Sequence, residues 1–66
     1  MQIVLNGKAV SVQAGLDVAG LVFEKKMDPN LVLVEYNGQV IKKEDWPGVK
    51  LKEGDRLELF QLVGGG

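Results

Sequence analysis

"MQIVLNGKAVSVQ", residues 1–13, holds the first signal from which the fold of this chain can be predicted. Short apolar runs lie on either side of the pair Asn6-Gly7. Asn-Gly suits the type I′ turn of a β-hairpin, because both central positions of that turn have a positive φ. We therefore expect the chain to open with two antiparallel strands.

The residues after this hairpin change from strand spacing to helical spacing. In residues 16–28 apolar positions recur three and four residues apart, as on one face of an α-helix. Asp17 suits the N-cap, and Lys25 and Lys26 are predicted to lie in the last turn, where the helix dipole favours cations. Pro29 is expected to end the helix. The apolar positions are Val18, Leu21 and Val22.

A second strand–turn–strand unit is predicted for residues 31–43, again around an Asn-Gly pair. "EDWPG", residues 44–48, is too short for an ordinary helix and predicts a turn or a single helical turn, with Trp46 as a buried plug over the sheet edge. The last strand, residues 56–63, alternates in polarity. Leu57, Leu59 and Gln61 share one face of it, and Glu58, Phe60 and Leu62 share the other.

The element order is therefore β-β-α-β-β-β, which predicts an α+β fold of the β-grasp (ubiquitin-like) type. In that fold one helix packs across one face of a mixed sheet of four to five strands. The first and last strands would be parallel neighbours at the centre, and the last would also pair with the strand at residues 31–37. We assign residues 1–63 to this domain and residues 64–66 to a flexible glycine tail.

Composition excludes several kinds of site. The 66 residues include no cysteine and no histidine, so disulfides, thiolate chemistry and the usual zinc ligands are absent. A formal net charge of −1 argues against nucleic acid as a partner. No apolar run approaches the ~18 residues of a membrane span, and the segment after Met1 predicts a strand rather than a signal peptide. We expect a soluble cytoplasmic domain that binds no metal and no membrane.

The terminal glycines need a separate explanation, because glycine adds no side chain to a core and loses the most freedom on ordering. One interpretation is a loose end or a remnant. The other is a tail that enters a narrow site. Residues 63–66 could reach about 13 Å beyond the sheet at ~3.4 Å per residue.

The ordered set of motifs resembles the ubiquitin-like sulfur carriers of thiamine and molybdopterin biosynthesis, and the thiamine branch most closely. The resemblance covers the whole chain and ends on a Gly-Gly terminus. It is carried by "MQIVLNGKAV", "NGQVIKKEDW", "LKEGDRLELF" and "FQLVGGG".

The resemblance implies a carrier rather than an enzyme. An E1-like adenylyltransferase would use ATP to adenylate the carboxylate of Gly66, while this chain binds no cofactor itself. A sulfur-donating enzyme of the cysteine desulfurase type would then supply sulfur to form a thiocarboxylate. Thiazole synthase would take that sulfur into the thiazole ring of thiamine. Gly64 and Gly65 would enter the active site of the partner.

We predict that the partner docks on an exposed apolar patch, because such clusters on small domains tend to mark interfaces. Its expected members are Phe60, Leu62, Val4 and Leu33. The alternative is that Phe60 is covered by a loop. Three other functions stay open from the sequence: the small subunit of molybdopterin synthase, which is usually longer, a ubiquitin-like protein modifier, and a plain β-grasp interaction module.

Overall fold

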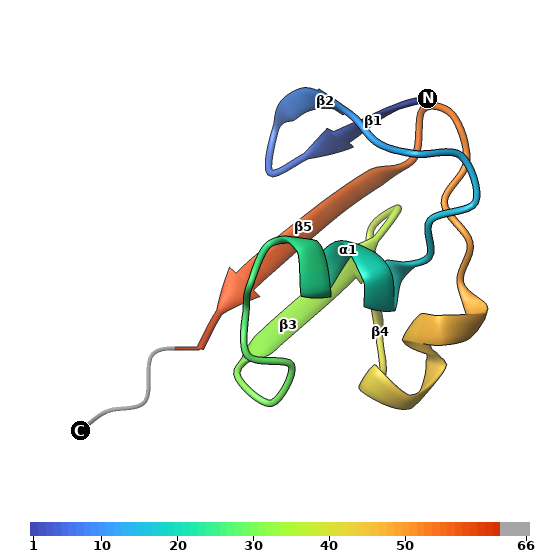
Figure 1. Cartoon of the computed structure of the whole chain (residues 1–66). Coiled ribbons are helices and arrows are strands. Elements are labelled where there is room, and N and C mark those ends of the chain that lie inside the picture. The colour runs from blue at the N-terminus through green and yellow to red at the C-terminus, as the bar shows by residue number, and fades with distance from the viewer. Residues whose placement is uncertain (63–66) are drawn as a thin grey trace.

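The computed structural model describes residues 1–62, which form a five-stranded mixed sheet with an α-helix packed on one of its faces (Figure 1). This is the β-grasp order predicted from the sequence. The elements are β1 (Gln2–Leu5), β2 (Lys8–Ser11), α1 (Val18–Glu24), β3 (Val32–Tyr36), β4 (Gln39–Ile41), the 3₁₀ helix η1 (Lys43–Gly48) and β5 (Arg56–Gln61).

The last strand lies at the centre of the sheet, whose order is β2-β1-β5-β3-β4. β5 is parallel to β1 and antiparallel to β3, while the two hairpins form the outer pairs. The predicted pairing of the first and last strands is confirmed. In Figure 1 the first hairpin is followed by α1, which lies across one face of the sheet, and then by the second hairpin. The chain next passes through η1 and enters β5, which ends near the C-terminus.

Both hairpins turn at the Asn-Gly pairs that predicted them. Asn6 and Asn37 each have a φ of 50°, and the glycines that follow, Gly7 and Gly38, have φ of 84° and 87°. Asparagine tolerates this left-handed region better than most residues and glycine adopts it without steric cost. The turn chemistry therefore sets where each hairpin folds back.

The same two asparagines also bind β5 from either side. The Asn6 side-chain oxygen accepts a hydrogen bond from the Leu59 N–H at 2.8 Å, and the Asn37 side-chain oxygen accepts one from the Arg56 N–H at 2.8 Å. β1 ends at Leu5. The Asn6 side chain therefore accepts from a β5 amide that has no residue of β1 opposite it. Each turn residue thus joins its hairpin to the central strand.

The helix is shorter than the sequence predicted. It begins after Asp17, whose carboxylate caps it by accepting from the Gly20 N–H at 2.7 Å, as expected. It ends at Glu24, so the prediction that Lys25 and Lys26 lie in its last turn is wrong, and so is Pro29 as its terminator.

The cause of the early ending is the backbone at Lys26, which has a φ of 57°. The Lys26 N–H donates to the Phe23 carbonyl and the Met27 N–H donates to the Val22 carbonyl, at 3.0 and 3.4 Å. These two bonds form a Schellman motif, which satisfies the last carbonyls of the helix. Glycine is the usual residue at this position, and a lysine there gave no sequence signal for the end.

The core lies between α1 and the face of the sheet that it covers. Trp46 belongs to this core at 4% exposure, which confirms its predicted role as a plug, and its indole N–H points to the Ile41 carbonyl at 3.4 Å. The buried apolar residues are Ile3, Leu5, Val18, Leu21, Val22, Val32, Val34, Trp46, Leu51, Leu57 and Leu59.

Among residues 1–62, no helix has both the length and the apolar character that crossing a membrane requires.

One buried carboxylate, that of Asp55, organises the start of β5. It accepts hydrogen bonds from the Tyr36 hydroxyl at 2.7 Å, the Lys52 N–H at 2.8 Å and the Asn37 side chain at 3.3 Å. Burial alone would raise the pKa of Asp55, but these three bonds and the nearby charge of Lys52 outweigh it and hold the pKa below its ordinary value. Asp55 therefore stabilises the fold in its ionised form.

We expect Asp55→Asn to lower the free energy of unfolding by about 2 kcal/mol at neutral pH, because the single oxygen of a buried amide cannot accept all three of these hydrogen bonds. Since the folded pKa is lowered, the contribution of Asp55 is present above the unfolded pKa of about 3.9 and is lost as the pH falls through the folded value. Urea unfolding between neutral and acid pH should show a smaller acid loss in the variant. Equal acid losses in both proteins would contradict this role.

Candidate docking face

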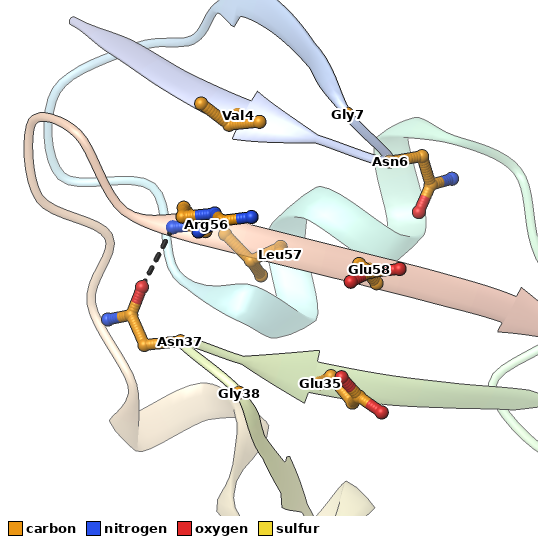
Figure 2. Close-up of a pocket in the computed structure, with 9 residues that line it drawn as sticks. All are labelled: Val4, Asn6, Gly7, Glu35, Asn37, Gly38, Arg56, Leu57 and Glu58. Atoms are coloured by element: carbon orange, nitrogen blue, oxygen red, sulfur yellow. Dashed lines mark hydrogen bonds between the residues drawn. The ribbon is translucent and has the colours of Figure 1, made fainter.

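Among residues 1–62 no other element covers the face of the sheet opposite α1, and Figure 2 looks onto that face with the helix behind the strands. On β5 the side chains alternate between the two faces. Leu57 and Leu59 are buried toward α1, while Arg56, Glu58 and Phe60 are exposed. We call this uncovered side the open face.

An apolar patch lies on the open face where β5 ends. Phe60 and Leu33 are direct cross-strand partners and are 40% and 37% exposed. Leu62, two residues further on, is 50% exposed, and its N–H donates to the Leu31 carbonyl, which extends the pairing past the end of β5. We call Phe60, Leu33 and Leu62 the apolar patch, and the chain leaves the sheet from it.

Val4, the fourth residue predicted for this patch, lies apart from it. It is the parallel partner of Arg56, four residues before Phe60 on β5. At about 3.3 Å per residue that separation is roughly 13 Å along the strand. The structure therefore brings together Phe60, Leu33 and Leu62 and places Val4 at the other end of the open face, partly buried.

A shallow hollow of about 470 Å³ occupies that other end, between the two Asn-Gly turns (Figure 2). Its walls mix polar backbone at the turns with charged side chains from β3 and β5. The lining residues are Val4, Asn6, Gly7, Glu35, Asn37, Gly38, Arg56, Leu57 and Glu58.

Sequence reasoning placed Glu58 on the face of Phe60 but missed Glu35, which lines the hollow beside it. Glu35 and Glu58 are direct cross-strand partners. The next pair along the two strands is Val34 and Leu59, and the pair after that is Leu33 and Phe60 of the apolar patch. The alternation of residues 32–36 could have placed Glu35 on the face of Leu33. It could not have placed Glu35 opposite Glu58, because that depends on the register between β3 and β5.

The described residues include the predicted docking surface but not the predicted tail. Among residues 1–62 no cluster of three or more acidic side chains is arranged to hold a metal ion. The predicted tail residues Gly64, Gly65 and Gly66 lie outside the described residues. The structure therefore positions the site only as far as Leu62, at the edge of the apolar patch.

Comparison with known proteins identifies relatives over the whole chain. A model of the ThiS family matches residues 2–66. The sulfur carrier protein ThiS of Escherichia coli is 30% identical, with both chains covered completely. The crystal structure of the thiamine biosynthesis protein ThiS of Geobacter metallireducens superposes with a TM-score of 0.85 at 33% identity, again over all of both chains.

A longer relative contains a segment similar to the whole chain. A thiazole synthase of Paramagnetospirillum magneticum is 33% identical over 66 residues. The present chain spans only 20% of that protein's length.

The assignment of β5 faces can be tested with two neighbouring residues. We expect Leu59→Ala to lower the free energy of unfolding by about 3 kcal/mol, because Leu59 is 6% exposed and its removal leaves a cavity. Phe60→Ala should cost about 1 kcal/mol or less, because its ring already contacts water. Chemical denaturation measures both. A larger loss for Phe60→Ala than for Leu59→Ala would show that Phe60 belongs to the core.

Proposed function

This chain belongs to the ThiS family, the sulfur carriers of thiamine biosynthesis, and we propose that it carries its sulfur as a thiocarboxylate on Gly66. The observation that supports this most directly is the end-to-end match to a carrier of the same family. The apolar patch supports it independently, because it lies where the chain leaves the sheet toward the glycines.

Three enzymes take part in the proposed cycle. An E1-like adenylyltransferase joins the Gly66 carboxylate to the α-phosphate of ATP, and pyrophosphate leaves. A persulfide on a sulfur-donating enzyme of the cysteine desulfurase type attacks the Gly66 acyl carbon with its outer sulfur, and AMP leaves with the activated oxygen. A thiol then reduces the resulting acyl disulfide, which releases the thiocarboxylate and leaves a disulfide behind. Thiazole synthase accepts the sulfur. The ATP belongs to the activating enzyme, and this chain contributes the carboxylate and the docking surface.

Glycines at 64–66 suit this chemistry for a physical reason. An acyl adenylate reacts readily with water, so it must form in a site from which water is excluded. A folded domain cannot enter such a site, but a chain of four residues beyond Leu62 can reach about 13 Å into it. Residues without a Cβ fit a narrow passage and adopt whatever φ it requires.

The docking energy must then come from the domain body. Ordering each tail residue costs about 1–2 kcal/mol, and glycines bring no side-chain contacts to offset that cost. The apolar patch is the surface nearest to the start of the tail. We propose that Phe60 and Leu33 enter a pocket on the partner and supply most of the affinity, as buried aromatic anchors do at other interfaces.

Thiazole synthase is the partner for which the relatives give support. A protein with that name contains a segment similar to this entire chain. Joining the two in one polypeptide suits a carrier that must contact the enzyme in each cycle, since it raises their effective concentration. We propose the same contact here between separate chains.

Deleting Gly66 tests the proposal. The truncated chain should bind the activating enzyme as tightly as the full chain, because the apolar patch is unchanged. It should support no ATP–pyrophosphate exchange, because the carboxylate is displaced by one residue, about 3.4 Å, from the reacting position. Its melting temperature should equal that of the full chain.

Binding constants and exchange rates measured on one preparation separate the outcomes. Unchanged exchange by the truncated chain would refute Gly66 as the reacting group. A truncated chain that also loses affinity would show that the tail, rather than the apolar patch, provides the docking energy.

A further inference from the structure

The open face places two like charges directly opposite each other beside the apolar patch. Glu35 on β3 and Glu58 on β5 are cross-strand partners in the antiparallel pair. Their Cβ atoms are then about 5 Å apart, a spacing at which like charges destabilise a sheet. Figure 2 shows both carboxylates on the same side of the sheet. The fold retains this pair on the surface that the proposed function assigns to docking.

One cation, Arg56, lines the same hollow as the two glutamates, so the acidic charges outnumber the basic charge there. Arg56 is the nearest cation on the same face of β5, two residues from Glu58. The hydrogen bond drawn in Figure 2 joins the Asn37 side chain to the Arg56 backbone. Among the nine residues drawn there, no hydrogen bond joins the Arg56 guanidinium to either carboxylate.

A partner that takes the tail must cover this pair. Residues 63–66 begin directly after Leu62, so the reacting site lies within about 13 Å of the apolar patch. A standard interface buries about 800 Å² of each partner, which is a patch of roughly 16 Å radius. Glu58 is two residues from Phe60, or about 7 Å along the strand. A footprint centred on Phe60 therefore covers both glutamates, and it also reaches Arg56, four residues or about 13 Å from Phe60, near its rim.

Covering two carboxylates without a cation would carry a large desolvation penalty. The contacting surface must therefore supply positive charge opposite them. A guanidinium suits this position better than an ammonium, because its planar fork can donate to two carboxylates at once.

We infer that the open face recognises an arginine side chain of the activating enzyme, placed between Glu35 and Glu58 while Phe60 occupies an adjacent apolar pocket. This inference rests on the proposed function. It adds that the partner must be basic at one defined point and that the acidic pair determines which enzyme the carrier accepts.

The test replaces both carboxylates in the full chain by Glu35→Gln and Glu58→Gln. Affinity for the cognate E1-like adenylyltransferase should fall by about tenfold or more. The dependence of the dissociation constant on salt should also become weaker around ~0.15 M ionic strength. The melting temperature should not fall, because the substitution removes a repulsion.

A matched control changes the same charges elsewhere. Glu24 ends α1 and Glu44 lies in η1, both exposed and both on the layer that covers the other face of the sheet. Glu24→Gln with Glu44→Gln makes the same change in net charge, and its affinity should stay within about twofold of the unchanged chain because charges remote from an interface contribute little. Phe60→Asp tests the apolar patch itself and should weaken binding by about tenfold or more. Phe23→Asp, on α1, is its control and should leave binding unchanged, because Phe23 is exposed on the other layer.

Comparing these variants distinguishes a failure of the inference from a failure of the proposed function on which it rests. If Phe60→Asp weakens binding and the Glu35/Glu58 variant does not, docking on the apolar patch holds and the arginine inference is wrong. If neither change weakens binding, or if the unchanged chain does not bind the enzyme, the docking proposal and the inference both fail. If the Glu24/Glu44 control loses as much affinity as the Glu35/Glu58 variant, the effect depends on net charge rather than on position, and the inference is wrong.

Discussion

The structure depends on the position of β5 between a parallel and an antiparallel neighbour. This strand pairs with β1 on one side and β3 on the other, and the Asn6 and Asn37 side chains bond its backbone from both turns. With both edges of β5 paired, its side chains can only point to the two faces of the sheet. One face completes the core under α1, and the other is the open face on which we propose docking. The same constraint fixes the position of Leu62, the last residue that the structure describes.

This division between a fixed body and a glycine tail suits a carrier that visits several enzymes. Binding specificity requires surface that is already ordered, because ordering it at each encounter costs free energy. Chemistry in a closed site requires a segment narrow enough to enter. One strand meets both needs here: β5 carries Glu58 and Phe60 on the open face, and its end leads into the tail. The proposed function therefore assigns affinity and reactivity to different residues, which can be altered separately.

Much of the fold could be predicted because it rests on local signals. The two Asn-Gly turns and the alternation of β5 were visible in single stretches of sequence. The helix end could not be predicted, since Lys26 holds a position usually given to glycine. Val4 was misplaced on the docking patch and Glu35 was overlooked for one reason: both depend on strand register. The role of Asp55 was equally hidden, because its partners are brought together only by folding.

The central claim is that sulfur is held on Gly66, and the intact mass of the protein isolated from cells that make thiamine tests it most directly. The account predicts a fraction heavier than the unmodified chain by the difference between one sulfur and one oxygen atom. Fragmentation should locate that difference at Gly66, and treatment with an alkylating reagent should label the same residue. Only unmodified chains, or a ladder of conjugates to lysines of other proteins, would contradict the account and favour an interaction module or a protein modifier.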